Sequence, residues 1–227
     1  MLHTNLFNVI ENNTVIENQH DARLLATGST HWRRHTNSYG KFWHGVTAFG
    51  APSITASLED GWMLYALVKA IKPKLTLEIG SNQGFSTCMI AAALVENDRG
   101  ELWTIDTEMS HLEAVADNLD HYGLSNHVKL YQGRATDILN TILPNMQNKF
   151  EFVFEDASHN ADEIIAELKL LAPYLSGEAY LVFHDSILLS SVAYTLMQVE
   201  SIIGPCQHIT IGTCRGLDIW QKIYVEG

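Results

Sequence analysis

Carboxylate and imidazole side chains follow two short apolar segments in the second half of this 227-residue chain. Asp156 and His159 come after Phe152–Glu155 in the run D-A-S-H, and Asp185 comes after Tyr180–Phe183 in the run H-D-S. A histidine with a pKa near ~6.5 suits proton abstraction at neutral pH. Two carboxylates close together repel each other unless a cation or a proton lies between them, and oxygen ligands suit Mg²⁺. We therefore predict a site for proton transfer, at which a histidine could act as general base and a divalent cation could bind between the carboxylates.

Each of these residues also has a plainer interpretation. Asp156 and Asp185 could be N-caps of the helices that follow them, and His159 could cap or pack at a helix start. His184 could draw the site toward a softer metal, or it could point into the sheet. The grouping is more specific than any single residue, because all these side chains follow strands and so fall at one edge of a parallel sheet.

A second constellation lies in the run L-T-L-E-I-G-S-N-Q-G-F-S, which reads as strand, tight loop and helix. Gly80 lets the backbone leave the strand, and Gly84 lets the helix N-terminus approach the sheet and a ligand. Glu78, near the strand end, could accept a hydrogen bond from an ammonium group. Asp106 ends the next strand, which is the position of the acid that binds ribose hydroxyls in nucleoside-binding folds. These features predict a nucleoside cofactor.

The loop does not fit a dinucleotide cofactor. Asn82 stands where the pattern G-x-G-x-x-G has its second glycine. That glycine lets a pyrophosphate approach the backbone, so its loss favours a cofactor without pyrophosphate. A nicotinamide dehydrogenase is accordingly a weaker alternative.

Alternating apolar segments predict the elements that position these residues. The expected helices are 57–70, with Ser57 as a candidate N-cap, 86–95, 111–121, 136–143, 161–171 and 187–203. The expected strands are 75–79, 102–105, 128–131, 152–155, 180–183, 208–212 and 217–222.

Strands that alternate with helices at this spacing predict right-handed βαβ units and a parallel sheet. The last two strands are joined only by Cys214, Arg215 and Gly216, a link short enough to force a hairpin. We therefore predict an α/β fold with a Rossmann-like, doubly wound, seven-stranded sheet whose last strand is reversed, and an N-terminal extension outside it.

Residues 1–56 differ from the rest, since they are polar, rich in Asn and His, and carry an aromatic and basic cluster. We expect them to form a lid or an oligomer contact, with partial disorder as the alternative. His31 and His35 have a helical i, i+4 spacing, but no H-E-x-x-H pattern joins them. Three aromatic side chains could cover an acceptor pocket: Trp32, Phe42 and Trp43.

The overall composition narrows the possible partners and location. The net charge of −12 argues against nucleic acid and anionic membrane, because binding phosphate backbones depends on Lys and Arg. Three scattered cysteines make a disulfide framework or a structural zinc site improbable. No signal-peptide pattern and no membrane-length apolar stretch is visible, so we expect a cytoplasmic protein.

From about Ser57 onward the chain resembles the class I S-adenosylmethionine-dependent O-methyltransferases. The similarity is to the cation-dependent catechol and caffeoyl-CoA type, and still more to the macrocin-type sugar O-methyltransferases and cephalosporin-hydroxylase-like proteins. The matching runs cover about three-quarters of the chain in family order: S-L-E-D-G, L-E-I-G-S-N-Q-G-F-S, L-W-T-I-D, G-L-S-N-H-V-K-L-Y-Q-G-R-A, F-E-F-V-F-E-D-A-S-H and L-V-F-H-D. The resemblance implies that residues 57–227 are a methyltransferase domain.

The resemblance also implies roles for particular residues. The cofactor would be bound by Glu78, Gly80, Ser81, Gly84, Ser86, Asp106, Arg134, Ala135 and Asp156. Arg134 departs from the small or acidic residue that is usual beside the adenine. The magnesium ligands would be Asp156, Asp185 and Ser186, the last in place of the family's Asn or Asp. Macrocin-type enzymes place a histidine at the position of His159.

These observations together predict an S-adenosylmethionine-dependent O-methyltransferase. The acceptor would be a small-molecule hydroxyl, on a sugar or a phenol, with a divalent cation and a histidine base. A homo-oligomer, with a dimer favoured, is expected. The alternative is a protein of the same fold that binds S-adenosylmethionine but is hydroxylase-like or serves as a non-catalytic assembly subunit.

Overall fold

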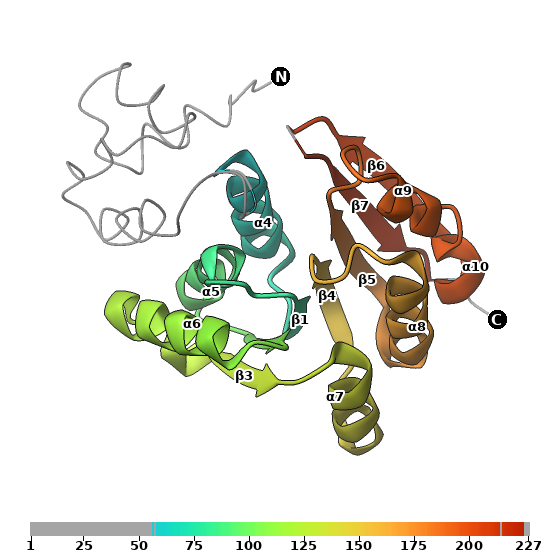
Figure 1. Ribbon diagram of the computed structural model, residues 1–227. Coiled ribbons are helices and arrows are strands. Elements are labelled where there is room, and N and C mark those ends of the chain that lie inside the picture. The colour runs from blue at the N-terminus through green and yellow to red at the C-terminus, as the bar shows by residue number, and fades with distance from the viewer. Residues whose placement is uncertain (1–55, 57, 214, 225–227) are drawn as a thin grey trace, which may run out of the picture.

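The computed structural model describes residue 56, residues 58–213 and residues 215–224. In this part of the chain, a seven-stranded sheet has the order β3-β2-β1-β4-β5-β7-β6 (Figure 1). The strands are β1 (Leu75–Ile79), β2 (Glu101–Asp106), β3 (Val128–Gln132), β4 (Phe150–Glu155), β5 (Leu175–His184), β6 (Cys206–Ile211) and β7 (Leu217–Lys222).

Helices connect the strands and cover the sheet on both sides (Figure 1). The α-helices are α4 (Leu58–Ile71), α5 (Phe85–Asn97), α6 (Met109–Tyr122), α7 (Ala135–Ile142), α8 (Ala161–Leu171), α9 (Ser190–Leu196) and α10 (Val199–Ile203). Short 3-10 helices are η2 (Ser125–His127), η3 (Leu143–Asn145) and η4 (Ala172–Tyr174).

The predicted fold class is confirmed, including the reversed last strand. β1 pairs in parallel with both β2 and β4, so the strand order changes direction between β1 and β4. β7 runs antiparallel to β5, with His184 opposite Leu217, and antiparallel to β6. The order reversal places a ligand crevice at the carboxyl ends of β1 and β4.

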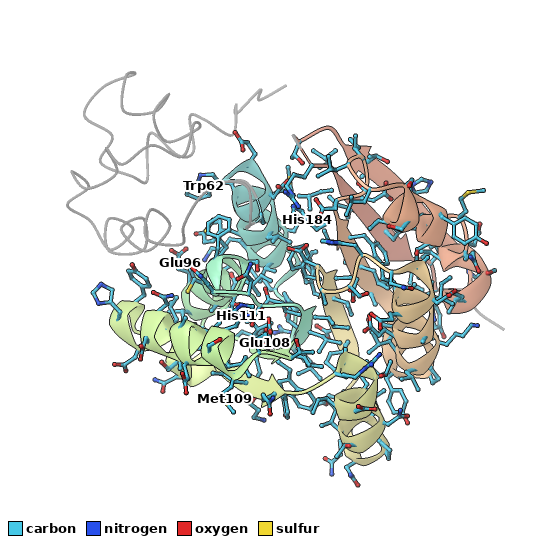
Figure 2. The ribbon with its side chains drawn as sticks, viewed as in Figure 1. Trp62, Glu96, Glu108, Met109, His111 and His184 are labelled. Carbon is cyan, nitrogen blue, oxygen red and sulfur yellow. The ribbon has the colours of Figure 1, made fainter. Side chains whose placement is uncertain are left out.

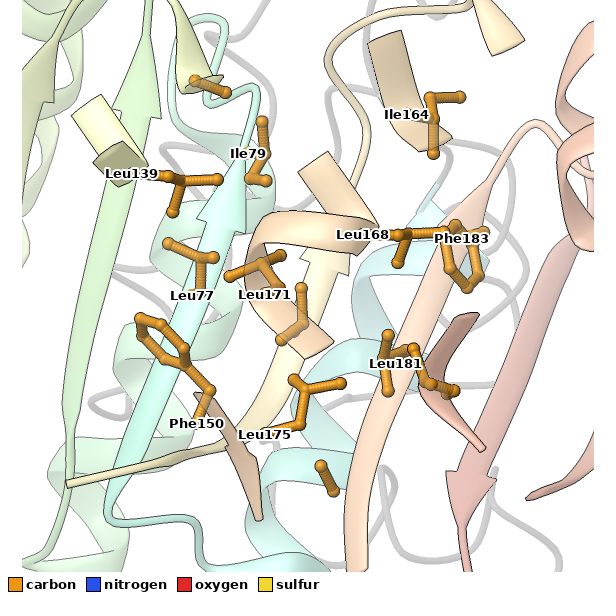
Figure 3. Packing of buried hydrophobic residues seen from close by; sticks show 14 of the residues in the cluster. Leu77, Ile79, Leu139, Phe150, Ile164, Leu168, Leu171, Leu175, Leu181 and Phe183 are labelled. Atoms are coloured by element: carbon orange, nitrogen blue, oxygen red, sulfur yellow. The ribbon is translucent and has the colours of Figure 1, made fainter. Parts of the chain in front are cut away.

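Alternation along the strands supplies a core on each face of the sheet. On the face covered by α7–α10, Leu77 and Ile79 pack with Leu139 and Leu168 (Figure 3). On the opposite face, a cluster of side chains from the sheet packs with α4 and α5 and includes Phe154. Full burial of each such side chain stabilises the fold by about 1.5–3 kcal/mol. The two cores hold the carboxyl ends of the strands in fixed register.

β5 is longer than the sequence predicted, since it begins at Leu175 and not at Tyr180. The first half of this strand reads L-S-G-E-A, which looks like a polar turn. In the structure Leu175 and Ala179 are buried, and Leu175 pairs with Phe150 before the register with β4 shifts. The irregular register explains why no regular alternation marked this half of the strand.

The helix predicted over 187–203 is wrong in its start and its continuity. The N–H groups of Ile187 and Leu188 donate to the Arg215 carbonyl at 3.2 and 3.1 Å, so this segment is tied to the β6–β7 link. α9 begins only at Ser190, and α10 is a separate helix that begins at Val199.

Several predictions on the N-terminal extension lie outside the described residues. These are the aromatic lid, the His31 and His35 pair and the Ser57 cap. Within the described ranges, no helix combines the length and the apolar character needed to cross a bilayer.

Candidate active site

A cavity of about 680 Å³ lies at the carboxyl ends of the central strands. Its walls come from the segments that follow β1, β2, β3 and β4, from His184 at the end of β5, and from Arg215. Neighbouring parallel strands point their carboxyl ends the same way, so residues distant in sequence meet here. Seven of the predicted cofactor-binding residues line the cavity, together with the predicted base: Gly80, Ser81, Ser86, Asp106, Arg134, Ala135, Asp156 and His159.

Gly80 and Gly84 shape the loop between β1 and α5. Both have a φ of +92°, which favours glycine. A Cβ on Gly80 would lie 2.5 Å from the Asp156 carbonyl oxygen, so the loop and the end of β4 are in direct contact. A Cβ on Gly84 would lie 3.0 Å from Val115 Cγ2, so this glycine lets α5 approach α6 and does not itself line the cavity.

Glu78 lies beneath the loop and is fully buried. Its Oε2 accepts hydrogen bonds from the hydroxyls of Thr87 and Thr104, each at 2.6 Å. Its Oε1 is buried without a hydrogen-bond partner among the described residues. Burial raises the pKa of Glu78 to about 7, although the surrounding hydroxyls limit the rise. No Lys, Arg or His side chain of the described residues hydrogen-bonds to this carboxyl, which lies next to the cavity wall formed by Ile79 and Gly80.

Asp106 is held on both of its oxygens at the end of β2. Oδ2 accepts from the Asn82 backbone N–H at 2.8 Å and from the Ser81 hydroxyl at 3.3 Å. Oδ1 accepts from the Glu108 N–H at 2.9 Å and lies 3.1 Å from His111 Nδ1. The contact with Asn82 gives that residue a role in fixing the acid, besides its position in the loop.

Arg134 and Ala135 line the far side of the same cavity, after β3. Arg134 Nη2 lies 2.9 Å from Glu163 Oε1 on α8, and Ala135 begins α7. The carboxylate of Glu163 therefore lies beside the predicted adenine position, but it comes from α8 and is paired with Arg134.

Asp156 and Asp60 lie on either side of His184. His184 Nδ1 is 2.8 Å from Asp156 Oδ1, and its Nε2 is 3.1 Å from Asp60 Oδ2. Burial alone would lower the pKa of His184, but the hydrogen bonds with the two carboxylates outweigh it and raise the pKa to about 10. Figure 2 shows His184 beside α4, well apart from His111 at the start of α6. His184 is therefore a buried cation between two acids.

Asp185 is shared by a histidine and an arginine. Its Oδ1 and Oδ2 accept from Arg215 Nε and Nη2 at 2.6 and 2.9 Å. The same Oδ2 lies 2.9 Å from His159 Nε2, and His159 is half-exposed on the cavity wall. A carboxylate that holds one ring nitrogen of a histidine orients the ring and leaves the other nitrogen to accept a proton.

The capping interpretations do not describe these residues. The N-cap of α8 is Asn160, whose side chain accepts from the Asp162 N–H at 2.9 Å. The N-cap of α9 is Leu189, without a side-chain cap bond. Asp156 instead lines the cavity and contacts His184, and Asp185 contacts His159 on the cavity wall.

The predicted magnesium site stays a prediction, and its donors have other partners. Ligand atoms of Asp156, His184 and Asp185 lie within 4.8 Å of one another, which is compatible with a metal cluster in size. However, both oxygens of Asp185 bind Arg215, and both nitrogens of His184 face carboxylates. The buried hydroxyl of Ser186 has no described partner and does not line the cavity. As they stand, these residues do not fit a divalent cation.

Three of the residues that complete the site carry no signal in the sequence. Asp60 reads as a first-turn acid of α4, and it reaches His184 across 124 positions. Arg215 lies in a hairpin link, and His111 reads as a surface residue of α6. Only the reversed pairing of β7 with β5 brings Arg215 to Asp185.

Residues 77–186 match a family model described as a methyltransferase domain. This segment is similar to methyltransferase domains and covers just under half of the chain. Among curated relatives of the domain, the catechol O-methyltransferase of Niastella koreensis is 33% identical over 108 residues, which are 48% of this chain and 48% of the relative. Caffeoyl-CoA O-methyltransferase 5 of Nicotiana tabacum is 28% identical over 106 residues, which are 46% and 43% of the two chains. The matches thus span about half the length of these relatives.

Solved structures of O-methyltransferases share the fold of this chain. The O-methyltransferase TomG of Streptomyces achromogenes, in complex with S-adenosylmethionine, superposes with a TM-score of 0.69 at 22% identity, covering 98% of this chain and 100% of TomG. An O-methyltransferase of Bacillus cereus, in complex with S-adenosylhomocysteine, gives a TM-score of 0.69 at 18% identity, covering 94% and 99% of the two chains. The resemblance to class I O-methyltransferases is confirmed.

Proposed function

We propose that this chain transfers the methyl group of S-adenosylmethionine to a hydroxyl oxygen of a small molecule. The observation that carries the proposal is the position of His159, held by Asp185, on the wall of the cavity that also contains Asp106 and the Gly80 loop. One cavity thus combines a nucleoside-binding pattern with a base. Phenolic acceptors are the first choice, since the relatives include catechol and caffeoyl-CoA O-methyltransferases.

The cofactor half of the cavity suits the chemistry of the donor. S-adenosylmethionine supplies an electrophilic methyl group on a sulfonium centre, together with an ammonium group and a ribose. Asp106 is placed to accept hydrogen bonds from ribose hydroxyls, and Glu78 lies near the loop where the ammonium group would bind. Gly80 and Ser81 bring backbone atoms to the cavity wall.

The acceptor half removes the proton. The oxygen of the acceptor forms the new carbon–oxygen bond, its proton passes to the free nitrogen of His159, and the carbon–sulfur electron pair stays on sulfur. Asp185 stabilises the imidazolium that results, because it already binds Nε2 at 2.9 Å. Alignment of the reacting groups supplies ~7–11 kcal/mol in well-oriented cases, so the protein needs little further chemistry.

The test is His159→Gln, assayed with S-adenosylmethionine and catechol or caffeate by release of S-adenosylhomocysteine. We expect kcat to fall by roughly 10²–10⁴-fold, with cofactor affinity unchanged by calorimetry. His208→Gln is a matched control, because His208 is also half-exposed and also faces a buried aspartate, Asp218, at 3.3 Å but away from the cavity. Cofactor binding without methyl transfer to any sugar or phenol would support the assembly-protein alternative and overturn the proposal.

Three further expectations remain part of this proposal. They are a sugar as the alternative acceptor, a homodimer and a cytoplasmic location. A divalent cation is not part of the proposed mechanism, because two of its three predicted ligands, Asp185 and Asp156, already bind Arg215 and His184.

A further inference from the structure

Three aspartates converge at the acceptor end of the cavity. Asp60 and Asp185 are completely buried, and the Asp156 side chain is only 17% exposed. Buried carboxylates are costly unless hydrogen-bonded cations compensate them. A divalent cation would be one form of compensation, and basic side chains of the chain itself would be another.

Arg215 binds Asp185 in the geometry of a strong ion pair. Its Nε and Nη2 meet the two carboxylate oxygens at 2.6 and 2.9 Å, so the contact is bidentate. A guanidinium presents a planar fork that matches a carboxylate and stays charged at every pH that a protein tolerates. A metal ion that used Asp185 would have to compete with the guanidinium for these oxygens and would lie close to its positive charge.

The backbone of Arg215 and Gly216 is held by hydrogen bonds to the segment after β5. The Arg215 carbonyl accepts from the N–H groups of Ile187 and Leu188, and the Gly216 carbonyl accepts from Ser186 N–H at 3.3 Å. Gly216 has a φ of +89°, and a Cβ there would lie 2.6 Å from the Ile187 nitrogen. The link that carries Arg215 is therefore packed directly against the segment that follows Asp185.

His184 compensates the remaining two acids by its position. Each of its ring nitrogens faces a carboxylate oxygen, Asp156 on one side and Asp60 on the other. To become a metal ligand, either nitrogen would have to give up one of these contacts. The two candidate metal ligands next to Asp156, which are His184 and Asp185, thus already bind other side chains of the protein.

We propose that Arg215 takes the place of the divalent cation at this site, so that the folded protein binds no metal between Asp156 and Asp185. Given the proposed function, Arg215 is a positioning residue, since it shares Oδ2 of Asp185 with His159 and so fixes the base. Without a metal to chelate, the acceptor needs only one hydroxyl. The acceptor class therefore includes phenols that lack an adjacent second oxygen.

Mn²⁺ tests this directly, as a paramagnetic probe titrated into the full-length protein with free Mn²⁺ read by electron paramagnetic resonance. We expect Mn²⁺ binding by the wild type, if there is any, to be unchanged by Asp185→Asn. We expect Arg215→Gln to bind Mn²⁺ at least tenfold more tightly than the wild type, and Arg215→Gln combined with Asp185→Asn to lose that gain. Wild-type binding that depends on Asp185, or no gain in a folded Arg215→Gln variant, overturns the proposal. If Arg215→Gln does not fold, the comparison of wild type with Asp185→Asn still decides it.

A second readout separates this inference from the proposed function. Methyl transfer by the wild type should stay within twofold after treatment with EDTA, and a monohydroxyl phenol should be accepted. A protein that binds no Mn²⁺ at Asp185 and transfers no methyl group would contradict the proposed function alone. Transfer that is abolished by EDTA and restored by Mg²⁺ would contradict the inference alone.

Discussion

The two halves of the cavity treat buried acids differently. In the cofactor half, Glu78 meets threonine hydroxyls, and Asp106 meets backbone N–H groups, a serine hydroxyl and the partly exposed His111. In the acceptor half, Asp156 and Asp185 bind the buried His184 and the guanidinium of Arg215. Neutral donors predominate in the first half, whereas full cations predominate in the second.

The difference agrees with what each half is proposed to hold. S-adenosylmethionine carries positive charge on its sulfonium and ammonium groups. The carboxyls of the cofactor half lack strong cationic partners, so this half favours binding of a positively charged molecule. The acceptor half has to deprotonate a neutral hydroxyl, and it carries its own compensating charges. Substitutions of charged residues in the acceptor half should therefore lower the stability of the fold. Substitutions in the cofactor half should instead change cofactor affinity or the pH dependence of stability.

The largest expected effect is the removal of His184. His184→Ala leaves Asp60 and Asp156 without the buried cation between them, and loss of one partner from such a pair costs about 3–5 kcal/mol. Urea unfolding at pH 7 measures the loss. His111→Ala is the matched change in the cofactor half, and it should cost no more than about 1 kcal/mol because His111 is 35% exposed. Equal losses of unfolding free energy in His184→Ala and His111→Ala would contradict the proposed difference between the two halves of the cavity.

The next effect is on the pH dependence of stability through Glu78. Burial raises the pKa of Glu78 from 4.5 to about 7, so the folded state holds a proton that the unfolded state releases. The contribution of this group to the free energy of unfolding is therefore fully present below pH 4.5 and is lost as pH rises through 7. Glu78→Gln should gain about 3 kcal/mol relative to the wild type between pH 4.5 and 8. A difference that does not change with pH, measured by urea unfolding, would contradict this.

A smaller effect should appear in cofactor affinity. Asp106→Asn removes a charged acceptor, and such hydrogen bonds contribute about 1.5–3 kcal/mol, so Kd for S-adenosylhomocysteine should rise roughly 10–100-fold by calorimetry. Asp185→Asn, in the acceptor half, should change the same Kd by less than about threefold. Similar losses in both variants would mean that the two halves bind the cofactor together.

The smallest effect is expected at Ser186. Its buried hydroxyl has no hydrogen-bond partner among the described residues. Ser186→Ala should therefore be neutral or stabilise the fold by up to about 1 kcal/mol, with methyl transfer unchanged. A large loss of activity would instead support Ser186 as a metal ligand.

The sequence predicted what depends on local patterns. The strand and loop through Gly80 and the acid at Asp106 were identified from spacing, the base in the D-A-S-H run from the family resemblance, and the reversed β7 from the short hairpin link. The beginning of β5 was missed, because its register with β4 is irregular. The partners of the aspartates were missed as well, because Asp60 and Arg215 reach them only through the packing of α4 and the pairing of β7.

The contact at Gly80 bears on how acceptor preference could change in evolution. Since a Cβ at this position would lie 2.5 Å from the Asp156 carbonyl oxygen, the donor loop and the strand end that leads to His159 share one backbone junction. A substitution there moves both together. Walls such as those near Ala56 lie outside that junction. Descendants of this chain can therefore acquire new acceptors at these walls while they inherit an unaltered donor geometry.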